Sequence, residues 1–370
     1  EEVSRGLGDV YKRQLIMIIL CFTSPDLSQT GKFYWALFTY ITFTTLYTII
    51  AIPVGSLIPA MTQDRDERTS LASFRYLGAS SGSIAVAVLT LPLVGLFSSP
   101  QFGFPIVVGC LAVLGAIFAF LCFFNTKEVY SKPYEETIGI KKVTKMVFNN
   151  YPLHFVILAL LTTWVANNIK QLTVVYFVKY NLQLEAYFSP ILLGVILQIM
   201  FGAYLVNLIK HRFEKKTLFM IGTFLYVITD LIIYYITGYE NFWLLAFIAT
   251  FGFIGFGMAG VMAWSMIADT IEYGEWKSGF RAEGVLNAAH VFVFKLSVGF
   301  SAWLAGVILE STDYVANAID QSPETLNGLF IMGYIFPAVA GTIAIIVTYF
   351  NKYDSNFYER IFSELKQRQS

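Results

Sequence analysis

Long apolar stretches alternate along the chain with short segments that carry most of the polar residues. A helix needs about 20 mostly apolar residues to cross the hydrocarbon of a bilayer. Nine stretches meet this requirement: 33–60, 76–98, 104–124, 153–178, 186–209, 218–237, 241–268, 284–309 and 326–350. A further run, 15–22, is too short to cross alone. The pattern predicts an all-α membrane protein with about nine complete transmembrane helices and one partial helix before them.

The composition supports a membrane protein and argues against several other classes. Hydrophobic residues make up 56% of the chain and charged residues only 14%, more apolar surface than a soluble fold can bury, so we expect a lipid bilayer around it. A net charge of zero, with the charges gathered in loops, argues against nucleic-acid binding. We find no catalytic motif of the Ser/His/Asp, HExxH or P-loop kind, and the three cysteines lack metal-ligand spacing. The sequence therefore predicts no enzyme, no metal site and no cofactor.

Lysine and arginine are distributed unequally between the two sets of loops. The connections 61–75, 125–152, 210–217, 269–283 and the tail 351–370 carry 18 of the 25 basic residues, whereas the alternating connections carry 2. Cytoplasmic loops of membrane proteins are enriched in these residues. The distribution predicts a cytoplasmic C-terminus.

The polar segments also divide the chain into regions. We interpret 15–124 as the remainder of an N-terminal helix bundle, 125–152 as a cytoplasmic linker, 153–350 as a C-terminal bundle and 351–370 as an amphipathic cytoplasmic tail. Residues 1–14 resemble a translated adaptor sequence and are expected to be non-native. A genuine cytoplasmic extension is the alternative.

Two loops carry the same order of charges at corresponding places. Each follows a long apolar stretch and runs from acidic to basic residues: Asp64, Arg65, Glu67 and Arg68 in the first, and Asp269, Glu272, Glu275 and Arg281 in the second. Parallel repeats give such a pattern. We predict that these residues form a gate of ion pairs at the cytoplasmic mouth; the alternative is that solvated loops simply carry charges.

The residues around these loops resemble a known family. The runs IPVGSLIPAMTQDRDERTSLASFRYLGASSG (52–82) and WSMIADTIEYGEWKSGFRAEG (264–284) are similar to the two signature loops of the glycoside/pentoside/hexuronide:cation symporters, the melibiose-carrier branch of the major facilitator superfamily. The resemblance implies twelve helices, of which the first two are absent here and the third is partial. It also implies a secondary active transporter that moves a sugar with Na⁺ or H⁺ by alternating access, in a bacterial inner membrane.

The resemblance also implies roles for residues near the first loop. Arg75 stands where the family has a sugar-contacting arginine, and Tyr47 and Thr48 stand near its sugar and cation sites respectively. Ala51 replaces a family carboxylate, which puts the cation site in doubt. Arg75 as a positive-inside charge, and Tyr47 and Thr48 as packing residues, are the alternatives.

Ionisable residues inside apolar stretches are candidates for a transport site, because each costs about 2.5 to 3.5 kcal/mol at a helix centre. Lys295 matches a family lysine that faces the central cavity, with snorkelling to the interface as the alternative. Lys170, close to Asn167, is predicted to bind substrate or to hydrogen-bond to neighbouring helices. For Asp230 and His290, isolated in apolar helices, we expect interhelical hydrogen bonds.

The glycines of GFIGFGMAG (252–260) could belong to a nucleotide-binding loop or to a close contact between helices. A nucleotide-binding loop would follow a strand, and the flanks here are apolar stretches of helical length. We therefore expect these glycines to allow close packing of helices.

Two other functions compete with sugar symport. One is a transporter of the same fold that carries a non-sugar solute such as a lipid or nucleoside. The other is a non-transporting membrane sensor or scaffold, for which a central cavity without polar residues is expected.

Overall fold

The computed structural model describes residues 13–62, 64–126, 139–280, 283–315, 318, 320–351 and 355–369. This part is helical and contains no strand, and nine of its helices are long and apolar enough to cross a membrane, which confirms the predicted class and number. After a first helical segment at 13–21, the helices are α2 Gln29–Met61, α3 Arg65–Val94, α4 Pro100–Asn125, α5 Ile140–Asn149, α6 Tyr151–Tyr176, α7 Phe188–Ile209, α8 Lys215–Ile232, α9 Phe242–Ser278, α10 Glu283–Ser311, α11 Pro323–Phe350 and α12 Ser355–Gln369.

The chain forms two compact units. Unit 1 is drawn from 1–63 and 81–132, and unit 2 from 64–80 and 133–370, so the first part of α3 belongs to unit 2. In unit 1 the Trp35 indole N–H donates to the Thr23 carbonyl at 3.1 Å, and the Phe22 and Phe104 rings stack. These contacts join the segment at 13–21 and its following turn to α2 and α4.

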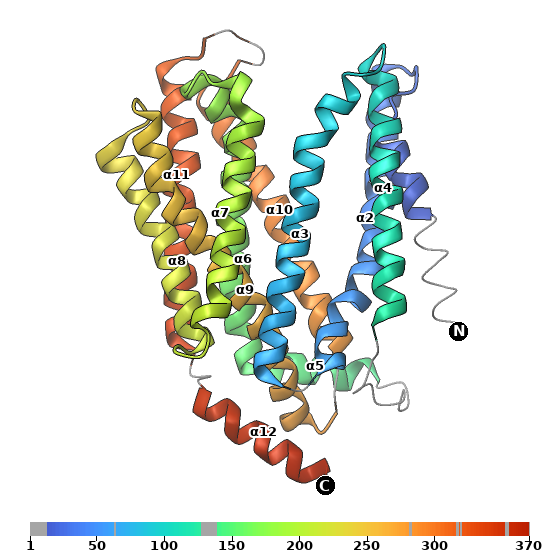
Figure 1. Ribbon diagram of the computed structural model, residues 1–370, viewed down its shortest axis with the longest axis vertical. Helices are drawn as coiled ribbons and strands as arrows, with labels where there is room; N and C mark the ends of the chain where they lie inside the picture. Colours follow the sequence, from blue (N-terminus) through green and yellow to red (C-terminus); the bar gives the residue numbers. More distant parts are fainter. Residues whose placement is uncertain are drawn as a thin grey trace. The chain divides into compact units, whose positions relative to one another are not determined.

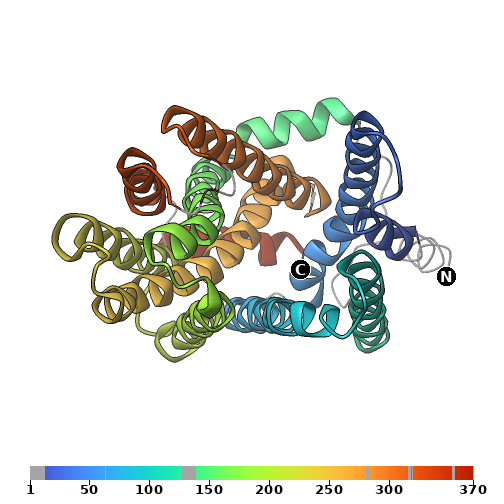
Figure 2. The same ribbon diagram turned by 90° about the horizontal axis from the view of Figure 1, so that it is seen from above.

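In unit 2, α8 packs between α9 and α11, while α6 packs between α10 and α11 and α7 packs on α9 (Figures 1 and 2). The short helix α12 lies across one end of α9, drawn in red in Figure 1. We call this the α12 end of the unit. The next element along the chain from both α6 and α8 is a single π-helical turn, Phe177–Asn181 and Ile233–Thr237.

Side-chain caps fix where several of these helices begin. Asn150, Asn241 and Ser322 each accept a hydrogen bond from the backbone N–H three residues further on, at 3.1 to 3.2 Å. Ser28 does the same for α2. The caps matter because the first N–H groups of a helix have no partner within it.

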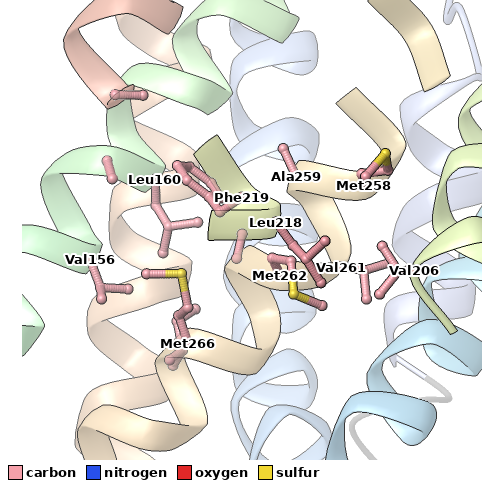
Figure 3. Close-up of a cluster of buried hydrophobic side chains, with 14 of the residues drawn as sticks. Val156, Leu160, Val206, Leu218, Phe219, Met258, Ala259, Val261, Met262 and Met266 are labelled. Atoms are coloured by element: carbon pink, nitrogen blue, oxygen red, sulfur yellow. The ribbon is translucent and has the colours of Figure 1, made fainter. Parts of the chain in front are cut away.

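The core of unit 2 is a cluster of small and flexible apolar side chains (Figure 3). Met258, Met262 and Met266 project from α9 into a cluster that also contains Leu160 of α6 and Leu218 of α8. Lipid tails are as apolar as these residues, so helices associate in a membrane through close packing rather than through the hydrophobic effect. The cluster is therefore a close-packed contact between α6, α7, α8, α9 and α11.

Glycines bring α9 into backbone contact with its neighbours, which confirms the close packing predicted for 252–260. A β-carbon at Gly257 would lie 2.0 Å from the Ile199 carbonyl oxygen of α7, and one at Gly255 would lie 2.4 Å from the Gly222 carbonyl oxygen of α8. Gly202 of α7 has the reciprocal relation to Ile254 of α9, at 2.0 Å.

We therefore predict that Gly202→Ala lowers the thermal unfolding midpoint of the purified protein, because its methyl group requires α7 and α9 to separate, an overpacking cost of about 1 to 3 kcal/mol. Gly194→Ala is the matched control on the same helix, since a β-carbon there meets nothing within 4 Å. Equal midpoints for the two variants would contradict the packing described here.

Candidate functional site

Two parts of the sequence predicted to carry gate charges meet at the α12 end of unit 2. Arg68 of α3 forms an ion pair with Glu272 of α9, and both side chains are almost completely buried. The Tyr358 hydroxyl of α12 donates to the other oxygen of the same carboxylate. Close by, the Thr69 and Ser265 hydroxyls lie 3.2 Å apart. The contact thus joins α3, α9 and α12 through one carboxylate.

A second ion pair lies one turn away on α9. Lys215, the first residue of α8, donates to both oxygens of Asp269 at 2.7 and 3.0 Å. Its ammonium group also lies 5.8 Å from the centre of the Tyr358 ring. Because α8, α9 and α12 converge here, movement of any one of them changes the surroundings of both pairs.

The other predicted gate residues have different surroundings. Asp64 caps α3 by accepting a hydrogen bond from the Glu67 backbone N–H at 2.8 Å, and both residues are exposed. Glu275 is buried. Arg281 and the side chain of Arg65 lie outside the described residues.

A stack of polar and aromatic side chains lies between α3, α9 and α10. The Arg75 guanidinium is 4.4 Å from the centre of the Trp264 ring, and the His290 and Trp264 ring centres are 4.2 Å apart. His290 is buried, and its Nδ1 atom makes no hydrogen bond within the described part of the chain. A buried polar atom of this kind costs about 1 to 3 kcal/mol unless water or a ligand satisfies it.

A second buried nitrogen without a described hydrogen-bond partner belongs to an indole of α6. The Trp164 Nε1 atom is buried and makes no hydrogen bond to any described residue. Its ring packs edge-on against Phe294, one helical turn after His290 on α10, with ring centres 5.1 Å apart. The Trp164 Nε1 atom and the His290 Nδ1 atom, neither of which makes a hydrogen bond in the described part of the chain, thus lie at the same stretch of α10.

The remaining candidates in unit 2 lie on α6 and α10. Lys295 is partly exposed on α10, and Asn167 is buried on α6. The neighbouring Asn168 donates its amide N–H to the Ser297 hydroxyl at 3.0 Å. This hydrogen bond joins α6 to α10 near the aromatic residues.

The α2 candidates belong to unit 1. Tyr47 is 44% exposed, and Thr48 donates its hydroxyl to the Thr44 carbonyl of its own helix at 2.7 Å. Ala51 follows one turn after Thr48 and is partly exposed.

The interhelical hydrogen bond expected for Asp230 of α8 is confirmed, because the Lys170 ammonium of α6 donates to its carboxylate and forms an ion pair with it. The Lys170 ammonium is also surrounded by aromatic rings, 4.5 Å from Tyr226, 5.2 Å from Phe253 and 5.1 Å from Tyr334. These residues come from α6, α8, α9 and α11, so the pair ties four helices together. This geometry favours the interhelical role for Lys170 over contact with a substrate.

Sequence reasoning overlooked Lys215, Tyr358 and Trp264. Lys215 counted only as one of the basic loop residues, and Tyr358 lies on the apolar face of the tail with Ile361 and Leu365, where the spacing indicates packing and not a hydrogen bond to a gate residue. Trp264 lies within the second signature run, yet only its position opposite Arg75 and His290 distinguishes it. No local pattern specifies which distant helix a side chain meets.

For the Lys170–Asp230 pair, we predict that Asp230→Leu or Lys170→Leu alone lowers the stability of the protein by about 3 to 5 kcal/mol, since each leaves a buried charge without its partner. The double variant is expected to recover most of that loss. Denaturant or thermal unfolding in detergent measures both effects. Single variants as stable as the parent would show that the pair does not hold these helices.

Comparison with known proteins gives the family. Residues 13–355 match the model of the family described as MFS/sugar transport protein. A Bacillus subtilis (strain 168) protein named uncharacterized symporter YjmB is 33% identical, over 95% of this chain and 77% of its own length. The isoprimeverose transporter of Lactiplantibacillus pentosus is 30% identical, over 95% of this chain and 74% of its own length.

A solved structure gives the fold independently. The major facilitator superfamily transporter FucP, in its outward conformation, superposes with a TM-score of 0.60 over 93% of this chain and 83% of its own, at 11% sequence identity. The family match covers both signature loops and every helix from α2 to α11. This chain therefore belongs to the MFS/sugar transport protein family and is a membrane transporter rather than an enzyme.

Proposed function

We propose that this transporter moves a glycoside, pentoside or hexuronide across a bacterial inner membrane together with Na⁺ or H⁺, by alternating exposure of one site. Its similarity to the isoprimeverose transporter supports a sugar substrate. The basic residues at the α12 end support a cytoplasmic C-terminus.

The observation that carries the proposal is the stack of Arg75, Trp264 and His290. Sugars present apolar C–H faces and a rim of hydroxyl groups, so their sites combine aromatic rings with hydrogen-bonding side chains. Trp264 supplies the ring, and Arg75 supplies a fork of N–H donors suited to neighbouring hydroxyls. The Nδ1 atom of His290 and the Nε1 atom of Trp164, which make no hydrogen bond within the described part of the chain, add hydrogen-bonding capacity.

Lys295 belongs to the same proposal as a residue that contacts the substrate, and Asn167 as a supporting polar residue on α6. Tyr47 and Thr48 of α2 are proposed to face the sugar and the cation respectively. Thr48 is the weaker assignment, because Ala51 supplies no carboxylate and Na⁺ prefers charged oxygen ligands.

The α12-end ion pairs are proposed to act as the cytoplasmic gate. Arg68–Glu272 joins α3 to α9, and transporters of this kind expose their site by moving helices apart at one end. Asp269 takes part through Lys215. The remaining gate residues are proposed from their places in the two charged loops: Asp64, Arg65, Glu67, Glu275 and Arg281.

To test the substrate site, we predict that Trp264→Ala weakens sugar binding about tenfold, as expected for the loss of about 1 to 2 kcal/mol of ring contact. The measurement is uptake of radiolabelled sugars, including a pentoside and a hexuronide, by the full-length protein in proteoliposomes with a Na⁺ or a pH gradient. Trp303→Ala, which removes an exposed tryptophan of α10, is the matched control.

Uptake that requires one of the gradients would identify the coupling ion. Transport of a lipid or nucleoside without any sugar uptake would contradict the proposal. So would a Trp264→Ala variant with the same apparent affinity as Trp303→Ala.

To test the gate, we predict that Glu272→Gln exposes Ser265, since the Arg68 ion pair is lost. A cysteine at position 265, in a background with the three native cysteines replaced by alanine, is expected to react about tenfold faster with a membrane-impermeant maleimide added from the cytoplasmic side. Glu310→Gln, an exposed acid at the other end of α10, is the control. An unchanged rate in the Glu272 variant would exclude this pair from the gate.

A further inference from the structure

A cavity unrelated to the proposed sugar site lies beside the connection between α7 and α8. Its volume is about 270 Å³. Its walls come from the first turns of α3, from the connection itself, from α8 and α9, and from α12. Its lining includes Lys210, Arg212, Glu214, Lys215 and Glu359.

Several basic side chains line the cavity, and they differ in whether they already make an ion pair or a hydrogen bond. Lys215 is held by Asp269, and Lys210 donates to the Ser70 hydroxyl at 2.8 Å. Arg212 is exposed, and its guanidinium makes no ion pair or hydrogen bond to another side chain in the part of the chain that the structure describes. Arg212 is therefore a basic side chain of this cavity whose donors are available for a ligand.

The backbone adds to this positive character. The cavity includes Glu214 and Lys215, the residues at which α8 begins, and the Glu214 side chain does not cap the helix. The first N–H groups of a helix lack partners within it and favour an anion at that end. Arginine and helix N–H groups together are well suited to the tetrahedral oxygens of a phosphate.

The position of the cavity along the membrane-spanning helices indicates which part of the bilayer lies next to a bound anion. One membrane-spanning helix ends at Ile209 and the next begins at Lys215, so the residues between them lie at the membrane surface. Phosphate headgroups occupy this level, and basic pockets between helices attract anionic lipids. The apolar residues Leu218 and Met262 line the cavity on its membrane side.

We propose that this cavity binds a phosphate group through Arg212, Lys210 and the start of α8. The phosphate belongs either to the headgroup of an anionic phospholipid or to a soluble phosphate ester. The acidic residues Glu214 and Glu359 line the same cavity and are exposed, so they weaken binding without preventing it. The proposal is independent of which solute the transporter carries.

The test uses the purified full-length protein and measures binding of three probes by native mass spectrometry and by fluorescence titration. The probes are phosphatidylglycerol, phosphatidylcholine with the same acyl chains, and glycerol 3-phosphate. Arg212→Gln is expected to weaken binding of the phosphate probe about tenfold, as loss of a hydrogen bond to a charged group does. Glu359→Gln is expected to strengthen it about threefold, because a repelling charge is removed.

Lys142→Gln, which removes an exposed basic residue of α5 outside the cavity, is the matched control and is expected to leave binding unchanged. Tight phosphatidylglycerol binding with these opposite effects supports a lipid headgroup, whereas the same effects on glycerol 3-phosphate support a soluble ester. The proposal is overturned if Arg212→Gln and Lys142→Gln behave alike. Equal binding of phosphatidylglycerol and phosphatidylcholine, with no binding of glycerol 3-phosphate, would overturn it too.

Discussion

Removing a charged side chain from water costs several kcal/mol. In a bilayer, interactions within the protein must offset that cost. Unit 2 meets this constraint with buried ion pairs between helices: Lys170–Asp230, Lys215–Asp269 and Arg68–Glu272. Each pair requires two helices to meet at one level along their axes. The pairs thereby fix the axial positions of α3, α6, α8 and α9, and the glycines of α7, α8 and α9 allow the backbones to approach closely enough for the pairs to form.

The pairs differ in what surrounds them, and we interpret that difference as functional. Lys170–Asp230 lies about four turns into α8 and is enclosed by Tyr226, Phe253 and Tyr334. It is a structural connection. Arg68–Glu272 and Lys215–Asp269 lie at the α12 end, where Tyr358 and the hydroxyls of Thr69 and Ser265 offer alternative polar partners. Pairs with such alternatives can exchange at a lower cost than a pair enclosed by aromatic rings.

The helices were predictable from sequence because a bilayer imposes one requirement, a long apolar stretch, that is visible residue by residue. The close packing of 252–260 was predictable for a similar reason, since small residues at helical spacing have few other uses in a membrane. The charges Arg68 and Glu272 could be singled out because their two loops repeat one another.

What the sequence could not provide was the choice of partners. Asp230 and Lys170 are 60 residues apart, and neither segment contains a pattern that points to the other. Tyr358 reaches Glu272 from a tail that, by its spacing, is an ordinary amphipathic helix. Trp264 becomes a candidate for sugar contact only when Arg75 and His290 are seen next to it. These relations depend on how helices are placed in three dimensions, which local periodicity does not encode.

We propose that the contact between α3 and α9 at the α12 end must open in each transport cycle. Thr69 and Ser265 lie opposite one another in that contact, with hydroxyls 3.2 Å apart. A Thr69→Cys, Ser265→Cys variant without the native cysteines allows the contact to be closed by oxidation and reopened by a reductant. We predict that sugar transport in proteoliposomes stops on oxidation and returns on reduction. Transport at the same rate in the fully cross-linked protein would contradict it.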